Sequence, residues 1–179
     1  MARVRIVTTA DLPPADRKRI RALMDAAFGG EFDDHDWDHA LGGLHILITD
    51  GEKPVAHASV VQRRFLHEGR SWRGGYVEAV AVHPDRQRRG LGSRVMAGAE
   101  RVIDRTYEFG ALSTSEAART MYLARGWLPW RGETWAMSPA GLLRTEDDDD
   151  STLVRPVPGA HELHLTGRLA CDWREGDVW

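Results

Sequence analysis

An apolar strand that leads through a glycine-containing turn into a helix is the feature that most constrains the fold of this chain. The strand runs from Tyr76 to Val82, the turn has the sequence QRRGLG at residues 87–92, and apolar residues then recur at helical spacing from Leu91 to Ile103. Glycines let the backbone approach a ligand closely, and a helix N-terminus offers unpaired N–H groups and a positive dipole end to an anion. This order of elements predicts a pyrophosphate site, to which four arginines add charge: Arg86, Arg88, Arg89 and Arg94.

Hydrophobic periodicity predicts two helices near the start of the chain, then antiparallel strands, a strand–helix–strand crossover and a strand-rich end. Helices are expected from the start signal at Asp11, Pro13 and Pro14 to Phe28, from Asp33 or Asp34 to Leu41, from Gly90 or Leu91 to about Tyr107, and from Ser115 or Glu116 to Ala124. Strands are expected at residues 4–8, 44–49, 54–65, 72–82, 112–114, 127–130, 134–137, 153–157 and 162–170. Asp50-Gly51 predicts a hairpin turn between two of the strands, because both residues tolerate positive φ.

Length and composition favour one domain over residues 1–179. The chain is 42% hydrophobic, enough for one core, and contains neither an internal repeat nor a linker. No stretch approaches the roughly 20 apolar residues of a membrane helix, so we expect a soluble, cytoplasmic protein with no membrane partner. The lone cysteine, Cys171, excludes an intramolecular disulfide and is expected to be a small buried side chain in a strand.

Glu78 is the candidate general base. It lies inside the apolar strand that leads to the turn, where a carboxylate is costly to desolvate unless it is paired, hydrated or used. A carboxylate at this position can remove a proton from an ammonium group, directly or through water. The alternative is an exposed residue on the edge of the sheet.

The turn resembles the Q/R-x-x-G-x-G/A signature of the Gcn5-related acetyltransferases, and it lacks the Lys-Ser/Thr of a P-loop and the third glycine of a dinucleotide fingerprint. The resemblance implies a coenzyme A site, with acetyl-CoA as the acetyl donor. A solvated basic loop is the alternative, while the acidic remainder of the chain argues against a nucleic acid partner. The coenzyme-binding residues that the resemblance implies are Val80, Ala81, Val82, Gln87, Arg88, Arg89, Gly90, Leu91, Gly92 and Ser93.

The same resemblance implies two further catalytic roles. The backbone N–H of Val80 is expected to donate a hydrogen bond to the thioester oxygen as that oxygen gains negative charge. Tyr122, in the helix before Gly126-Trp127, is expected to protonate the departing coenzyme A thiolate. The alternative for Tyr122 is a tyrosine that packs on an amphipathic helix.

The charges of the chain are segregated. Its 24 basic and 27 acidic residues give a net charge of −3, yet arginines gather at residues 86–94 while acids gather at 31–38 and 146–150. The separation predicts two charged partners of opposite sign. The acidic segments and the aromatic C-terminus can form a pocket for a polycation, although such acids are usually a solvated face or a helix cap.

His35 and His39 share a helix face, but no third ligand is evident and we predict no metal site.

Six segments spread over essentially the whole chain resemble the aminoglycoside 2'-N-acetyltransferases: residues 31–37, 41–45 (LGGLH), 62–64 (QRR), 75–78 (GYVE), 126–130 (GWLPW) and 171–179. The resemblance implies an α/β acetyltransferase fold with a mixed, mostly antiparallel sheet flanked by helices, a possible homodimer, and acetylation of a drug amine that confers resistance. The implied aminoglycoside contacts are Glu31, Asp36, Trp37, Glu78, Ala79, Ser113, Asp148, Asp177 and the terminal carboxylate of Trp179. Position 31 departs from the pattern, because relatives often have Asp there.

Two other functions remain open. The acceptor of the same chemistry can be another amine, such as a cell-wall sugar or a peptide N-terminus. A second alternative is an acetyl-CoA-binding module without activity, against which Glu78 and Tyr122 argue.

Overall fold

The computed structural model describes residues 4–179, which pack into two compact units. The first unit holds residues 4–61 and 77–102, and the second holds residues 62–76 and 103–179. Strands β3 (Lys53–His67) and β4 (Arg70–Val82) and helix α3 (Leu91–Thr106) contribute residues to both. A single domain over residues 1–179 stays a prediction. Across residues 4–179, no helix combines the length and apolar character needed to cross a bilayer.

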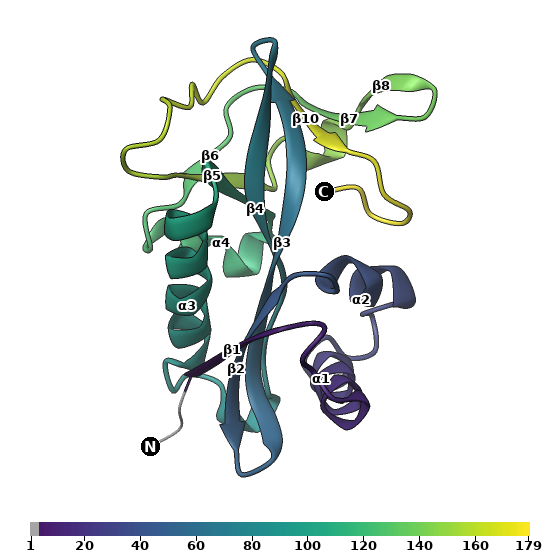
Figure 1. Cartoon of the computed structure of the whole chain (residues 1–179), viewed down its shortest axis with the longest axis vertical. Helices are drawn as coiled ribbons and strands as arrows, with labels where there is room; N and C mark the ends of the chain where they lie inside the picture. Colours follow the sequence, from purple (N-terminus) through teal and green to yellow (C-terminus); the bar gives the residue numbers. More distant parts are fainter. Residues whose placement is uncertain (1–3) are drawn as a thin grey trace. The chain divides into compact units, whose positions relative to one another are not determined.

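The first unit is an antiparallel sheet covered by helices on both faces (Figure 1). Its other elements are β1 (Val4–Thr8), α1 (Pro14–Ala27), α2 (Asp34–Ala40), β2 (Leu44–Asp50) and the short 3-10 helix η1 (Pro84–Arg86). Strand β2 pairs antiparallel with both β1 and β3. These bounds confirm the predicted N-terminal strand, both early helices and the hairpin at Asp50-Gly51.

Two adjacent residues of β2 show why helices cover both faces. Side chains of successive strand residues point to opposite faces. Ile46 lies against Gly98 of α3, where an added Cβ would meet its side chain at 2.8 Å. Leu47 instead joins the buried cluster that contains Ile20 and Leu23 of α1. Helices α1 and α3 therefore pack on opposite sides of this sheet.

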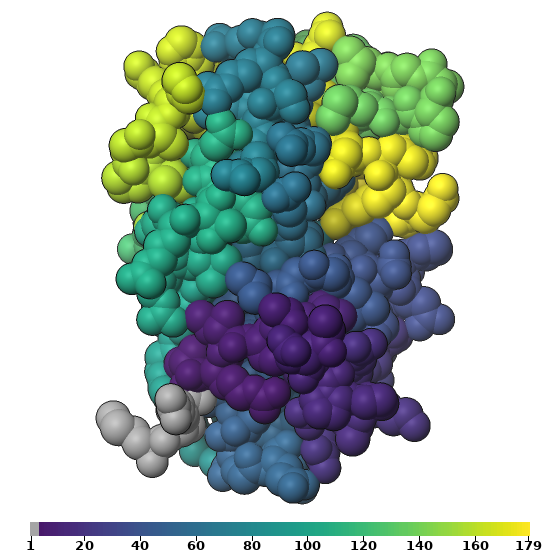
Figure 2. Space-filling view, viewed as in Figure 1, coloured from purple at the N-terminus to yellow at the C-terminus, as the bar shows by residue number. Residues whose placement is uncertain are grey.

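The second unit contains β5 (Phe109–Ser113), α4 (Glu116–Leu123), β6 (Leu128–Pro129), β7 (Thr134–Ser138), β8 (Gly141–Arg144), η2 (Glu146–Asp148), β9 (Thr152–Pro156) and β10 (Leu169–Asp172). Its strands follow the order β6-β9-β5-β4-β3-β10-β7-β8. Strand β5 runs parallel to β4 and β10 runs parallel to β7, whereas the pairs β3–β10, β5–β9, β6–β9 and β7–β8 are antiparallel. Figure 2 shows the C-terminal residues, in yellow, beside the light-green β7–β8 hairpin. The predicted mixed, mostly antiparallel sheet with flanking helices is confirmed.

Several boundaries in the second unit correct the sequence prediction. The strand expected at 162–170 is wrong, because β10 begins only at Leu169, after a turn at Gly167 with φ +86°. The strand expected at 112–114 already begins at Phe109, and it includes Gly110, where a Cβ would press on Ile103 and Trp127 at 3.1 Å. Strand β8 was not predicted, since its apolar residues Leu142 and Leu143 are adjacent and exposed rather than alternating.

Candidate active site

The candidate catalytic strand β4 is continuous but has an irregular backbone at Ala79. This residue has φ +49°, a left-handed conformation that is uncommon for alanine. Such a conformation costs on the order of 1–3 kcal/mol and persists only where its surroundings hold it. Glu78, Ala79 and Val80 are all partly exposed in succession, which an uninterrupted alternating strand would not allow. The irregular residue therefore lies between Glu78 and Val80, two positions where catalysis was predicted, and is itself a predicted substrate contact.

The predicted pyrophosphate turn lies directly between β4 and α3. Arg88 and Gly90 have φ +58° and +72°, so the backbone reverses sharply there. The first hydrogen bond of the helix runs from the N–H of Arg94 to the carbonyl of Gly90 at 3.1 Å. The N–H groups of Leu91, Gly92 and Ser93 precede it, and helix geometry gives them no acceptor. This arrangement fits an anion.

The arginines around the turn divide into two kinds. Arg88 and Arg89 are exposed, as is Gln87. Arg86 instead donates to Asp50 at the tip of the β2–β3 hairpin, at 2.6 Å, so part of its charge is compensated within the protein. In the strand before the turn, Ala81 is buried while Val80 and Val82 are partly exposed.

Glu31, Asp36 and Trp37 lie together at the start of α2 in the first unit. Glu31 is exposed. The Asp36 carboxylate accepts from the N–H of Asp33 at 2.9 Å, and the Asp33 carboxylate accepts from the N–H of Asp36 at 2.9 Å. Asp33 and Asp36 thus form a capping box. A helix cap was the alternative to a substrate-binding role for this acidic segment. Trp37 is half-buried against the core cluster beside α1.

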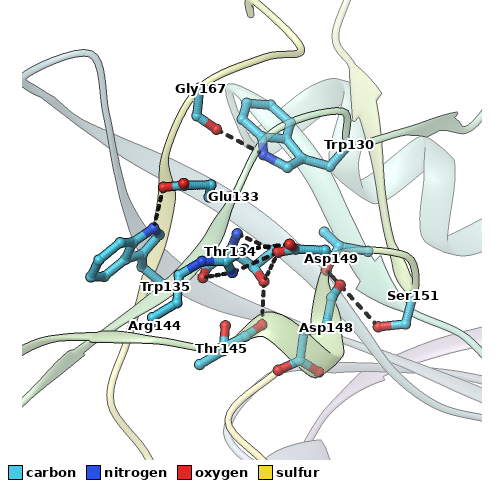
Figure 3. Close-up of polar contacts among 11 residues, drawn as sticks. Trp130, Glu133, Thr134, Trp135, Arg144, Thr145, Asp148, Asp149, Ser151 and Gly167 are labelled. Atoms are coloured by element: carbon cyan, nitrogen blue, oxygen red, sulfur yellow. Dashed lines mark hydrogen bonds and ion pairs between the residues drawn. The ribbon is translucent and has the colours of Figure 1, made fainter.

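Asp149 in the second unit is a framework residue. Its carboxylate forms an ion pair with Arg144 and accepts from the N–H and the hydroxyl of Thr134, both at 2.8 Å (Figure 3). These hydrogen bonds, that of Arg144 first, lower the pKa of Asp149 to about 2. Asp149 therefore fixes the end of η2 to β7.

Asp148, one residue earlier, has the opposite electrostatics. Its carboxylate points away from the Arg144–Asp149 pair (Figure 3). Burial, followed by the negative charges of Asp177, Asp147 and Asp149, raises the pKa of Asp148 to about 6. Asp148 and Asp177 are therefore close enough to repel each other, and both were predicted to contact a cationic substrate.

Ser113 belongs to the same neighbourhood as Asp148. Its hydroxyl donates to the Ser151 hydroxyl at 2.9 Å, and the Ser151 hydroxyl donates to the carbonyl of Asp148 at 3.2 Å. Three of the substrate residues predicted from the sequence, Ser113, Asp148 and Asp177, are thus gathered in the second unit.

The C-terminal tail is anchored by Arg63, a residue to which sequence reasoning gave no role. Its side chain is almost fully buried and donates to the Asp172 carboxylate at 2.7 Å, the Asp172 carbonyl at 2.6 Å and the Val178 carbonyl at 2.6 Å. The Trp179 ring is buried beside Phe65, with ring centroids 5.9 Å apart. The sequence feature that could have revealed this role is the position of Arg63, which lies on the same face of β3 as buried apolar residues.

Tyr122 lies in α4 and is buried, with its ring 6.3 Å from that of Trp127 in an edge-on contact. Burial raises the pKa of Tyr122 to about 12, so its hydroxyl stays protonated at neutral pH. A proton donor must carry its proton, and a tyrosine that only packs on the helix also keeps its proton. The raised pKa therefore fits both roles predicted for Tyr122.

A buried histidine pair lies behind Ala79 and was missed in the sequence. His45 of β2 and His57 of β3 are both fully buried, and their rings are joined at 2.9 Å. Burial, with a smaller effect from the charge of Arg17, lowers the pKa of His45 to about 4. Burial, followed by the proximity of His45, lowers the pKa of His57 to about 3. Their position in apolar strands was the signal that could have revealed them.

Known proteins resemble this chain in sequence and in fold. The Acetyltransferase (GNAT) domain family matches residues 9–129. An aminoglycoside 2'-N-acetyltransferase of Mycolicibacterium fortuitum is 49% identical over 177 residues, which cover 98% of this chain and 91% of that protein. Among solved structures, the GNAT family N-acetyltransferase YhbS of Escherichia coli, in complex with CoA, has a TM-score of 0.65 at 16% identity and covers 97% of this chain and 90% of its own. Escherichia coli ElaA has a TM-score of 0.61 at 16% identity, over 87% of this chain and 99% of its own.

The two structural likenesses support the fold, and the sequence matches support the family. Both sequence matches cover more than half of the chain, and the Mycolicibacterium fortuitum relative is covered almost entirely. The chain belongs to the GNAT acetyltransferases and, within them, to the family of the aminoglycoside 2'-N-acetyltransferases.

Proposed function

We propose that this enzyme transfers an acetyl group from acetyl-CoA to the 2'-amine of aminoglycoside antibiotics and thereby inactivates them. The observation that carries the proposal is the 49% identity, over 98% of the chain, to the aminoglycoside 2'-N-acetyltransferase of Mycolicibacterium fortuitum. The physical support comes from the two charged regions of opposite sign, one suited to a pyrophosphate and the other to a polycation.

The turn between β4 and α3 fits the pyrophosphate of acetyl-CoA. Its unpaired N–H groups and the exposed Arg88 and Arg89 provide hydrogen bonds and positive charge. The coenzyme supplies the acetyl group as a reactive thioester. The residues proposed to hold it are Val80, Ala81, Val82, Gln87, Arg88, Arg89, Gly90, Leu91, Gly92 and Ser93.

Three groups of this chain are proposed to serve the chemistry. Glu78, half-buried in β4, accepts the proton that the substrate ammonium must lose, directly or through water. The backbone N–H of Val80 donates to the thioester oxygen as negative charge develops on it. The Tyr122 hydroxyl, which stays protonated at neutral pH, returns a proton to the thiolate.

The proposed substrate residues include acids in both units. In the first unit they are Glu31, Asp36, Trp37, Glu78 and Ala79, and in the second they are Ser113, Asp148, Asp177 and the terminal carboxylate of Trp179. Burial, followed by the negative charges of Asp177, Asp147 and Asp149, raises the pKa of Asp148 to about 6, so Asp148 and Asp177 repel each other when both are ionised. A bound polycation relieves that repulsion, because an opposite charge stabilises the ionised carboxylates.

The resemblance to the family also leads us to propose a single-domain, cytoplasmic enzyme that forms a homodimer. Light scattering coupled to size-exclusion chromatography tests the last point. A molecular mass of one chain at all concentrations contradicts it.

Release of coenzyme A thiol tests the function with a matched pair of acceptors. Tobramycin has a 2'-amine and kanamycin A has a 2'-hydroxyl, while both are polycations. Rapid thiol release is expected with tobramycin and slow release with kanamycin A. Equal rates with the two drugs would be consistent with acetyltransferase activity but contradict the 2'-amine as the acceptor. Thiol release only with a peptide or cell-wall sugar amine contradicts an aminoglycoside as the substrate.

A further inference from the structure

A continuous chain of hydrogen bonds runs through the first unit to the irregular residue of β4. The N–H of Gly42 donates to the Thr9 hydroxyl at 2.9 Å, and this hydroxyl lies 2.7 Å from Nε2 of His45. Nδ1 of His45 lies 2.9 Å from Nε2 of His57, and Nδ1 of His57 lies 2.7 Å from the carbonyl oxygen of Ala79. Every ring nitrogen of the two histidines is thus engaged.

The acceptor at the end of the chain fixes the direction of every bond between the two rings. A carbonyl oxygen can only accept, so Nδ1 of His57 carries the proton. In a neutral ring Nε2 of His57 then accepts, and it does so from Nδ1–H of His45. Nε2 of His45 accepts in turn from the Thr9 hydroxyl at 2.7 Å, which is shorter than the 3.3 Å from this hydroxyl to its other acceptor, the Gly43 carbonyl. Both rings are therefore neutral Nδ1–H tautomers, in keeping with the lowered pKa of each.

The bond to Ala79 determines where the next N–H points. The carbonyl of Ala79 and the N–H of Val80 belong to one peptide unit, and the peptide bonds of the described residues are trans. In a planar trans peptide these two groups point in opposite directions. While His57 holds the carbonyl of Ala79, the N–H of Val80 is turned away from the histidine pair.

The strained conformation of Ala79 makes this restraint necessary. At φ +49° the residue lies outside the β region that its neighbours in β4 favour. The hydrogen bond from His57 to the Ala79 carbonyl is partly buried. A carbonyl that loses its donor there pays part of the desolvation penalty of an unpaired polar group, and the peptide can then rotate to recover a partner. The donor is therefore what keeps this peptide in one orientation.

We propose that His57, itself oriented by His45 and Thr9, is a positioning residue that holds the Ala79–Val80 peptide so that the N–H of Val80 faces the thioester oxygen. The proposal rests on the role given to Val80 under the proposed function. It adds a residue that contacts neither substrate nor coenzyme and acts through the backbone of β4.

Two variants of His57 separate positioning from packing. In His57→Asn the side-chain amide places an N–H donor where Nδ1 lies, whereas His57→Leu has no donor. The matched control is Ser59→Ala, which removes another buried donor from the same face of β3, the Ser59 hydroxyl that bonds the Ala40 carbonyl at 2.7 Å. The quantities to measure are kcat, the Kd for acetyl-CoA and Tm.

Loss of an oxyanion donor lowers kcat about 10²- to 10³-fold. His57→Leu is expected to lower kcat by about 10²-fold with little change in the Kd for acetyl-CoA, and His57→Asn to recover most of that loss. Ser59→Ala is expected to lower Tm and leave kcat near the wild-type value. A kcat for folded His57→Leu equal to that of Ser59→Ala overturns the proposal.

Nuclear magnetic resonance gives a readout that needs neither drug turnover nor a folded leucine variant. In the wild-type protein the ring ¹⁵N shifts of His45 and His57 must report Nδ1–H tautomers. Addition of acetyl-CoA without acceptor must shift the Val80 amide signal in the wild type and in His57→Asn. An Nε2–H tautomer at His57, or a Val80 amide indifferent to acetyl-CoA, overturns the positioning role even if aminoglycosides are acetylated. Failure of aminoglycoside turnover with these signals intact contradicts the proposed substrate alone.

Discussion

Two neighbouring carboxylates, Asp148 and Asp149, show how far the surroundings of a residue decide its role. Asp149 is paired with Arg144, and its pKa falls to about 2. Asp148 is partly buried and lies near other carboxylates, and its pKa rises to about 6. In the sequence they are two members of one acidic run, so the division between framework and proposed substrate contact becomes visible only in the structure.

Asp148→Asn is expected to stabilise the protein above pH 6. The pKa of Asp148 is about 6 in the folded protein against 3.8 ordinarily, so between these values the native state binds more protons and its stability falls as pH rises. At pH 7.5 the ionised carboxylate costs on the order of 1–2 kcal/mol after allowance for solvent screening. Thermal unfolding should show a higher Tm for the variant at pH 7.5 and no gain at pH 3.5. The exposed neighbour Asp147, changed to Asn, is the control, and an equal gain in both variants contradicts this reading.

The buried histidines predict loss of stability in mild acid. Folded His45 and His57 have pKa values of about 4 and about 3, below the ordinary 6.5, so the unfolded chain binds more protons as pH falls below 6.5. Each histidine removes about 2 kcal/mol of stability between pH 7 and pH 5. Urea unfolding of the wild type and His57→Asn at both pH values should show a smaller acid loss in the variant. Parallel losses argue against a neutral His57.

At the scale of elements, the tail after β10 depends on one side chain. Arg63→Met leaves the Asp172 and Val178 carbonyls without their buried donor, at a cost of about 2–4 kcal/mol. Arg64→Met, at the exposed neighbouring position, is expected to change stability by less than about 0.5 kcal/mol. Hydrogen exchange should report faster exchange of residues 172–179 only in the Arg63 variant. Unchanged protection there contradicts the anchoring role.

The turn before α3 predicts a specific effect on coenzyme binding. Acetyl-CoA that binds only the native state raises Tm, and Gly92→Asp should abolish most of that rise by placing bulk and negative charge beside the unpaired N–H groups. Ala97→Asp, on the exposed side of the same helix, is the matched control and should retain it. A Gly92→Asp protein with a full acetyl-CoA shift places the coenzyme elsewhere.

How far the sequence predicts each element depends on how local its cause is. Helix α1 follows from Pro14 and the paired glycines at 29–30, and the pyrophosphate turn from six consecutive residues. The segment 162–168 alternates like a strand, but its course is set by the contact of Gly132 with Gly167, which are far apart in sequence. The kink at Ala79 depends likewise on His57, a residue 22 positions away. Such long-range contacts leave no local pattern to read.

At the scale of the whole molecule, a net charge of −3 conceals two chemically distinct regions. The exposed arginines of the turn suit an anionic coenzyme, and the crowded carboxylates near Asp148 suit a cation. In the proposed function, acetyl-CoA binds at the first region and the aminoglycoside at the second. The account therefore depends on which amine of a polyamine drug receives the acetyl group.

The site of acetylation on tobramycin tests this most directly. The purified enzyme is incubated with tobramycin and acetyl-CoA, and the monoacetylated product is identified by NMR. The expected product carries an acetamide at the 2' position, and an acetyl group at the 3 or 6' amine contradicts the proposed function.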